Sequence, residues 1–270
     1  MPSFNFLSSH FIAVLLALIP LLVSAHEIEV VMGSEHWKYR EFGFLNNELD
    51  REQGWLSHIE FNSLLEVTRK HKIHTRLNAQ HGTLDYIGQT QGGNALRTRT
   101  KESTKGSAIS WRYYFTHAYL GLGVTQQMWD RKIQASAHSS KLDEYYRWWG
   151  PQLELGSFYT HNQLTIGFAS SVSVLNGNMI VDLTEVATSD NSVRNYGKPK
   201  IPLNDAYEIN AQLQIKYEFV RNWFLLLNHY QGLRHFPESD YVTVHSGIFL
   251  NEPKSKNYYY GVNAGVGIKF

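Results

Sequence analysis

The stretch Asn257–Phe270, which reads NYYYGVNAGVGIKF, decides the fold of this chain. Counted back from the terminal Phe270, every second residue is apolar: Ile268, Val266, Ala264, Val262, Tyr260 and Tyr258. Apart from Tyr259, the residues between them are small or polar. A period of two places the two sets on opposite faces of a β-strand. One apolar face and one small, polar face is typical of a barrel wall with lipid outside and packed side chains inside.

The chain ends on Phe270, and this ending resembles the signal by which bacterial outer-membrane barrels are recognised for assembly. The resemblance implies a Gram-negative outer-membrane location. It also implies that the C-terminal strand contacts the assembly machinery.

The start of the chain suits export. Residues 11–23 form a largely apolar run that is too short to cross a bilayer comfortably as a helix. Ser24 and Ala25 follow it and fit a signal-peptidase cleavage site. We therefore expect residues 1–25 to be a signal peptide and residues 26–270 to be the mature domain. The run is preceded by no Lys or Arg, only His10, so a membrane anchor remains the alternative.

Composition narrows the function classes. The formal net charge is +1, which disfavours a general nucleic-acid binder. The chain has no cysteine and therefore no disulfide. We also expect no cofactor and no metal. Aromatic residues make up 14%, and membrane barrels use them as girdles at the two interfaces.

Alternation of apolar and polar residues recurs along the mature chain, for example in Ile209–Phe219 and Ile109–Phe115. It predicts an all-β fold, a transmembrane antiparallel barrel of about ten strands. The expected strands are 28–43, 54–67, 72–88, 106–115, 119–133, 144–159, 163–183, 206–219, 223–235 and 257–270.

The connections between these strands alternate between short and long, as expected for short periplasmic turns and long outer loops. Two segments favour a twelve-strand alternative: Asn176-Gly177 is a hairpin signal, and Tyr241–Leu250 has strand-like composition. Twelve strands would put the long 184–205 stretch in the periplasm. We therefore prefer ten, with both segments as β-structure above the membrane.

Charged residues recur on the polar faces of the strands, and we expect them to pair inside a filled lumen, because isolated buried charges are costly. This predicted lumen network comprises Glu60, Glu66, Arg76, Arg112, Glu154, Lys216 and Glu218.

Ten strands with five long outer loops resemble the omptin family of outer-membrane proteases. That resemblance implies an Asp pair near the second outer loop and an Asp–His pair near the fourth. Here the segment Leu84–Gln91 supplies only Asp85, and Asp182, Asp190 and Asp205 have no nearby His. The stretch Leu84–Gly92 is also similar to a segment of proteobacterial outer-membrane barrels without an assigned activity.

A second set of candidate catalytic residues lies near the last outer loop, where His235 and His245 flank Asp240. Together with Asp85 they could form an acid–histidine group at the outer rim. The neighbouring pair His245-Ser246 suggests instead an enzyme that modifies lipid A, since such deacylases use a His–Ser pair.

Arg97, Arg99 and Lys101 alternate with threonines, so an extended chain would place these three cations on one face. Guanidinium groups pair well with phosphate, and we expect contact with lipopolysaccharide there. The sequence thus favours a monomeric outer-membrane barrel with a structural or interaction role. An outer-membrane hydrolase, omptin-like or acting on lipid A, is the first alternative, and a narrow channel is the second.

Overall fold

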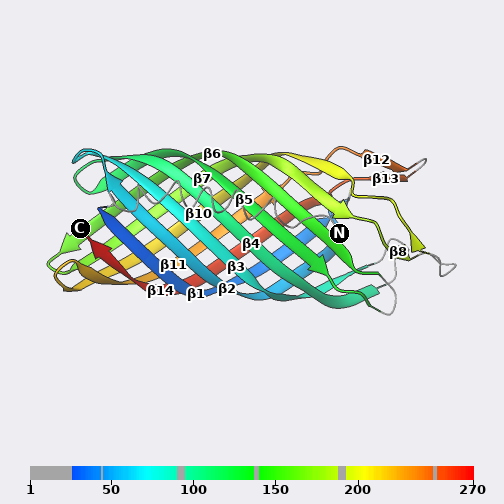
Figure 1. The fold of residues 1–270 in the computed structure, drawn as a ribbon, viewed down its shortest axis with the longest axis horizontal. Helices are drawn as coiled ribbons and strands as arrows, with labels where there is room; N and C mark the ends of the chain where they lie inside the picture. Colours follow the sequence, from blue (N-terminus) through cyan, green and yellow to red (C-terminus); the bar gives the residue numbers. More distant parts are fainter. Residues whose placement is uncertain (1–25, 44, 90–94, 137–139, 188–192, 246–247) are drawn as a thin grey trace.

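A computed structural model describes residues 26–43, 45–89, 95–136, 140–187, 193–245 and 248–270. The signal peptide expected over residues 1–25 and the candidate Ser246 lie outside these ranges. Long antiparallel strands form one closed barrel (Figure 1). No helix long and apolar enough to cross a membrane occurs in the described ranges.

The barrel confirms the all-β fold class and the preferred strand number. Its ten strands are β1 (Glu27–Phe42), β2 (Glu48–Glu66), β3 (His71–Gln89), β4 (Ala95–Tyr114), β5 (Ala118–Ile133), β6 (Leu142–His161), β7 (Leu164–Asp182), β10 (Lys200–Val220), β11 (Trp223–Phe236) and β14 (Lys254–Lys269).

Neighbouring strands pair in the order β1-β14-β11-β10-β7-β6-β5-β4-β3-β2, and β2 returns to β1. The closing pair, β1 with β14, runs in continuous register from Glu27↔Lys269 to Phe42↔Lys254. We call the end with the short connections, such as 67–70 and 221–222, the turn end, and the opposite end the loop end. Both described chain ends, His26 and Phe270, lie at the turn end, where the Phe270 N–H donates to the His26 carbonyl at 3.0 Å.

The two segments that favoured twelve strands do not add strands to the barrel. Asn176-Gly177 lies inside the continuous strand β7, and the irregularity falls on the partner strand β10, between Leu203 and Ala206. The Tyr241–Leu250 stretch contains the small hairpin β12 (Val242–His245) and β13 (Ile248–Leu250). This hairpin and the pair β8 (Val186–Ala187) and β9 (Val193–Arg194) lie beyond the barrel wall at the loop end (Figure 1).

The strands are longer than expected at the loop end. β4 begins at Ala95, where the sequence suggested a loop up to Lys105, and β2 begins at Glu48 and not at residue 54. The strands have from 14 residues in β11 to 21 in β10, whereas about 9–11 tilted residues cross a bilayer. A large part of each strand therefore projects beyond the hydrocarbon.

The exposed apolar side chains show which part projects. They gather on the outer wall towards the turn end and form an apolar belt: Met32, Ile59, Ile109, Leu122, Val124, Leu153, Leu155, Ile166, Phe168, Leu213, Ile215, Leu225, Leu227, Val262 and Val266. Aromatic residues border this belt, with Trp55, Trp149, Tyr258 and Tyr260 on its loop side and Trp111, Tyr159, Tyr217 and Trp223 on its turn side. This arrangement is that of a lipid-facing surface.

Polarity inverts along each strand where the belt ends. In β5, Leu122 and Val124 face lipid, but Lys132, on the same outward face, lies in the projecting half. On the inward face, Gly121 gives way to the fully buried Trp129. The belt half is therefore apolar outside and polar inside, and the projecting half is the reverse, as in a soluble protein.

The projecting half encloses a hydrophobic core within the lumen. Its buried members come from almost every barrel strand: Trp37, Tyr39, Leu56, Leu84, Trp129, Tyr146, Trp148, Leu175, Met179, Val181, Ile201, Leu203, Ala206, Tyr230, Phe236 and Tyr259. We call this set the lumen core. It fills the loop-end half of the barrel interior.

Candidate functional site

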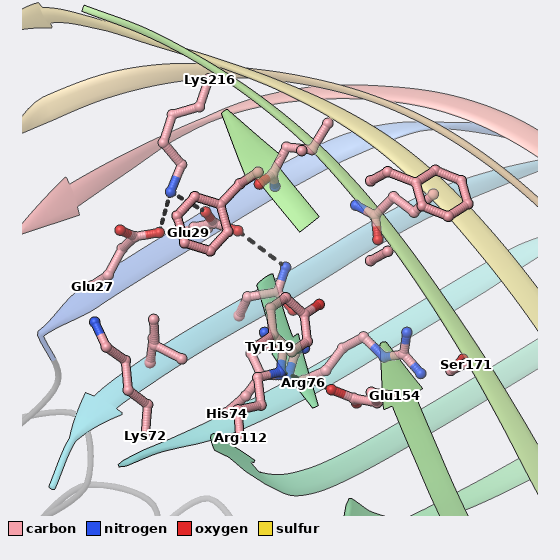
Figure 2. A pocket seen from close by; sticks show the side chains of 18 of the residues that line it. Glu27, Glu29, Lys72, His74, Arg76, Arg112, Tyr119, Glu154, Ser171 and Lys216 are labelled. Carbon is pink, nitrogen blue, oxygen red and sulfur yellow. Dashed lines mark hydrogen bonds and ion pairs between the residues drawn. The ribbon is translucent and has the colours of Figure 1, made fainter. Parts of the chain in front are cut away.

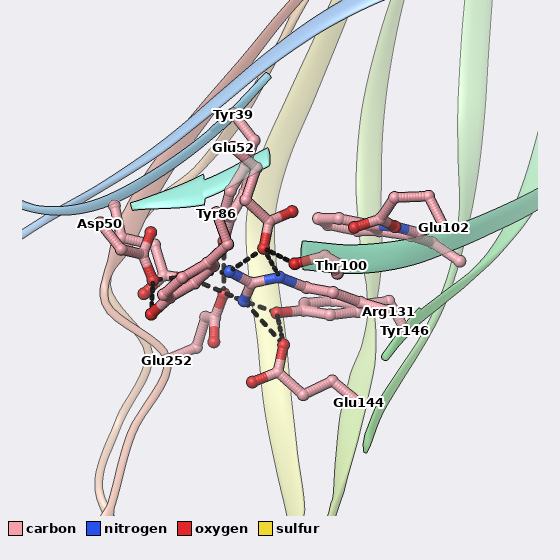
Figure 3. Close-up of polar contacts among 12 residues, drawn as sticks. Tyr39, Asp50, Glu52, Tyr86, Thr100, Glu102, Arg131, Glu144, Tyr146 and Glu252 are labelled. Atoms are coloured by element: carbon pink, nitrogen blue, oxygen red, sulfur yellow. Dashed lines mark hydrogen bonds and ion pairs between the residues drawn. The ribbon is translucent and has the colours of Figure 1, made fainter. Parts of the chain in front are cut away.

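One arginine lies at the centre of the loop-end lumen. Arg131 in β5 is 1% exposed and forms ion pairs with Glu41 at 2.8 Å, Glu144 at 2.8 Å, Glu52 at 2.9 Å and Asp50 at 3.5 Å (Figure 3). These acids come from β1, β6 and β2. We call these five residues the Arg131 cluster, and they tie together strands that are distant around the barrel.

Hydroxyl groups complete the coordination of the cluster. The Tyr39 hydroxyl donates to Glu41 at 2.9 Å, and the Tyr146 hydroxyl donates to Glu144 at 3.1 Å. The Tyr86 hydroxyl donates to Asp50 at 3.1 Å, and the Thr100 hydroxyl donates to Glu52 at 2.8 Å. Because the Arg131 guanidinium also lies 4.8 Å from the centre of the Tyr39 ring, the cation is enclosed on all sides.

Acid is in excess around this arginine. Two further buried carboxyl groups adjoin the cluster: Glu252 Oε1 lies 3.0 Å from the Tyr146 hydroxyl oxygen, and Glu102 accepts from the Trp129 indole N–H. Burial raises the pKa of Glu102, Glu252 and Asp50 well above the ordinary range, and nearby carboxylates add to the effect. We infer that part of this acid is held neutral, since one guanidinium cannot balance it.

The turn-end half of the lumen contains a cavity of about 350 Å³ (Figure 2). Charged residues of β1 to β4 line one side, among them Glu29, His74, Arg76 and Arg112. The opposite side, from β7 and β10, carries amide, hydroxyl and small side chains: Thr165, Gly167, Ala169, Ser170, Ser171, Asn210, Gln212 and Gln214. A polar chamber therefore lies inside the lipid-embedded half, below the closed lumen core.

The residues of the predicted lumen network lie on inward faces of the strands, and several of them form ion pairs. Arg112 Nε is 2.7 Å from Glu154 Oε2, and Lys216 Nζ is 3.1 Å from Glu29 Oε1 and also contacts Glu27. Glu66 and Glu218 lie near the turn-end rim, where they pair with Lys72 at 3.1 Å and Lys269 at 3.0 Å. Glu60 accepts from the Asn62 amide at 2.9 Å.

Arg76 is the exception in this network. No hydrogen bond or ion pair joins its guanidinium to another residue in the described ranges, although it lines the cavity.

The four candidate catalytic residues do not meet. Asp85 projects from the outer wall with its side chain 76% exposed, and its nearest ion-pair partner is Arg99 at 4.0 Å. His235 Nδ1 lies 3.1 Å from the Ser255 carbonyl, whereas the His245 ring lies 6.2 Å from that of Tyr196. Within the described ranges no contact joins any two of Asp85, His235, Asp240 and His245, and no group of three or more His, Asp or Glu residues could hold a metal ion. Their catalytic role stays a prediction.

The three predicted lipid-contacting cations do share one face. Arg97, Arg99 and Lys101 all point outward from β4, as exposed positions of a regular strand. They lie near the loop end, however, and Lys105 on the same face is closer to the belt residue Ile109. The segment is a strand and not a loop. Thr98 donates to the Gln134 carbonyl at 3.0 Å, and Thr100 and Glu102, on the face opposite the cations, form hydrogen bonds inside the lumen.

Sequence reasoning missed the Arg131 cluster and the lumen core. Composition suggested that aromatic residues form membrane girdles. Of the adjacent Trp148 and Trp149, however, only Trp149 points outward, with 63% exposure, whereas Trp148 is 2% exposed in the core. A signal was available in β6, where the apolar set changes from Tyr146 and Trp148 at even positions to Leu153 and Leu155 at odd positions. That change of parity marks the inversion of polarity.

Comparison with known proteins identifies the fold. No protein-family model and no curated protein matches the chain. The crystal structure of the outer membrane protease OmpT from Escherichia coli is similar at TM-score 0.66 and 11% identity, covering 90% of this chain and 96% of that one. The translocator domain of the autotransporter NalP from Neisseria meningitidis matches at TM-score 0.46 and 9% identity, over 97% and 96% of the two chains. The chain therefore has the fold of a bacterial outer-membrane β-barrel with omptin-like topology.

Proposed function

We propose that the protein is a closed outer-membrane barrel that serves as a rigid platform for the interaction surface at its loop end. One observation carries this proposal: the lumen core and the Arg131 cluster occupy the projecting half of the interior. A lumen packed with fully buried Trp37, Trp129 and Trp148 leaves no aqueous path from one end to the other.

The surface to be presented is the pair of hairpins beyond the wall. Tyr241 is 67% exposed, Phe249 62% and Val193 67%, although this end lies far from the apolar belt. Apolar side chains held in water beside ordered β-structure are typical of protein interaction sites.

Two measurements test the proposal. Purified protein in planar bilayers should show no conductance steps, because the core closes the lumen. Cells that display Tyr241→Ser with Phe249→Ser should attach to surfaces or to other cells less than wild-type cells do, and Ser103→Ala on the outer wall should behave as wild type. Steady conductance, or attachment that is equal in all three strains, would contradict it.

The hydrolase alternative has less support. The candidate acids and histidines lie apart, and a similarity of 11% identity to a protease indicates fold alone. Peptide or lipid A turnover by wild-type protein that is lost in Asp85→Ala or Asp240→Ala would establish it. The narrow-channel alternative is tested by the same conductance measurement.

The lipid partner we propose is lipopolysaccharide, bound by cations just above the loop-side aromatic girdle. Lys38 lies opposite Tyr258 in the sheet register, and Lys256 comes two residues before Tyr258 on the same face of β14. Arg147 comes two residues before Trp149 on the outward face of β6. Phosphate groups of an outer leaflet meet these cations before they meet Arg97, Arg99 or Lys101. Lys38→Gln with Lys256→Gln should weaken lipopolysaccharide binding to the refolded barrel more than Arg97→Gln with Arg99→Gln does.

A further inference from the structure

The cavity in the turn-end half is built into the barrel and is not a packing defect. Small side chains on β7, Gly167, Ala169 and Ser171, leave room opposite the charged strands. At most lumen glycines an added Cβ would meet backbone or side-chain atoms below 3.0 Å, for example at Gly123 and Gly265. At Gly167 the nearest atom would be at 3.7 Å, so packing does not require a glycine here. The position keeps space open.

Among the described residues, those that line the cavity reach the rim of the barrel at the turn end. Lys72, Lys216 and Lys269, which line the cavity, lie within a few residues of the short turns, and the Lys269 side chain is 34% exposed. Above the cavity, Glu208 accepts from Arg234 at 2.9 Å and from the Tyr259 hydroxyl at 2.6 Å, and the lumen core follows. A solute would therefore enter the cavity from the turn end, which the loop lengths assign to the periplasm.

Within the described ranges, every other Lys or Arg that lines the larger cavity has an ion-pair partner, and Arg76 does not. Lys72, Arg112, Lys216, Arg234 and Lys269 each have a carboxylate partner within 3.1 Å. Arg76 has none among the described residues, yet it lines both this cavity and the smaller one of about 50 Å³ directly above it. A guanidinium without a partner in a confined lumen is costly unless an anion or water completes its hydrogen bonds.

We propose that this cavity binds a small hydroxylated solute with a single anionic group, which enters from the periplasm and pairs with Arg76. The planar guanidinium offers the paired donors that a carboxylate or a phosphate accepts. Ser171, Asn210 and Gln212 on the facing wall offer the donors and acceptors that hydroxyl groups need. A second anionic group would find only cations that are already neutralised. A volume of about 350 Å³ suits a monosaccharide-sized molecule.

Three probes test the inference: glucuronate as the carboxylate, glucose 6-phosphate as the phosphate and glucose as the neutral control. Binding to the refolded full barrel in detergent is measured by calorimetry. At least one of the two anions should bind about tenfold more tightly than glucose, and which one does identifies the anionic group. Arg76→Gln should remove that preference, and Arg99→Gln on the outer wall should leave it intact.

A second variant tests whether the probes bind inside the cavity, without changing the charge of Arg76. Gly167→Leu should fill the cavity and reduce the affinity for every probe at least tenfold, while Arg76 stays in place. Failure of both anions to bind wild-type protein, or equal affinity in wild type and Arg76→Gln, would overturn the inference. Conductance and surface attachment do not depend on this cavity, so the proposed platform role stands or falls separately.

Discussion

The two halves of this barrel use the same strands with opposite polarity. In the turn-end half, Leu122 and Leu153 face lipid while Arg112 and Glu154 pair inside. In the projecting half, charged residues cover the wall and tryptophans fill the lumen. The difference follows from what surrounds each half, because hydrocarbon does not reward burial of apolar side chains and water does. We therefore expect substitutions of one kind to have different consequences in the two halves.

The largest effect is expected at the centre of the projecting half. Arg131→Gln leaves the carboxylates of the cluster without their cation, and we expect a loss of about 5 kcal/mol in the free energy of unfolding in lipid vesicles. Hydrogen exchange should accelerate at loop-end amides near Thr100 more than at belt amides near Val124. The exposed Arg99→Gln should change stability by no more than about 0.5 kcal/mol. Equal losses of stability in Arg131→Gln and Arg99→Gln would contradict the view that the buried cluster stabilises the projecting half.

The adjacent tryptophans of β6 give a matched pair. Trp148→Ala opens a cavity in the lumen core and should cost about 3–5 kcal/mol in denaturant unfolding. Trp149→Ala removes an outward girdle residue with 63% exposure and should cost much less. If Trp149→Ala costs more stability than Trp148→Ala, the lumen core does not stabilise the projecting half.

Two outward positions of β5 compare the surroundings directly. Leu122→Arg places a charge in the apolar belt and should destabilise the barrel by about 2–4 kcal/mol in vesicles. Lys132→Leu, on the same face in the projecting half, should stay within about 0.5 kcal/mol. A similar cost for both would mean that the hydrocarbon boundary does not lie between them.

A smaller effect is expected from the excess of buried carboxyl groups around Arg131, which should make the stability of the barrel depend on pH. The pKa of Glu102 is raised in the folded state, chiefly by burial, so folding retains a proton that the unfolded chain releases. Stability should be greatest below the ordinary glutamate pKa and fall as pH rises towards the raised one, with a slope of at most about 1.4 kcal/mol per pH unit for each retained proton.

The control variants separate this titration from the loss of a contact. Glu102→Gln should make the fall in thermal stability with rising pH less steep. The range to measure is roughly pH 5 to pH 8, which lies above the ordinary glutamate pKa. Thr100→Val removes a hydrogen bond to Glu52 and should lower stability without changing the slope. An unchanged slope in Glu102→Gln would show that Glu102 is already ionised in the folded barrel.

Much of the membrane half could be predicted from sequence, because each of its strands repeats one simple pattern. The pairs Arg112–Glu154 and Lys216–Glu29 lie on inward faces that alternation alone identifies. The Arg131 cluster could not be predicted in this way. Asp50 lies in a segment that the sequence assigns to a loop, and Glu41 and Glu144 lie at the ends of expected strands. Only barrel closure brings these acids together around Arg131. Periodicity shows whether a side chain points inward or outward, but not which residue it contacts across the lumen.

The closing seam has a consequence for biogenesis. Once β1 and β14 are joined from Glu27↔Lys269 to Phe42↔Lys254, the backbone edge of the last strand is fully occupied, and even the Phe270 amide is bonded to His26. Any factor that recognises this strand through its edge must do so, and let go, before the sheet becomes a cylinder. The same hydrogen bonds that close the barrel therefore leave no free backbone edge on β14 for such a factor to bind.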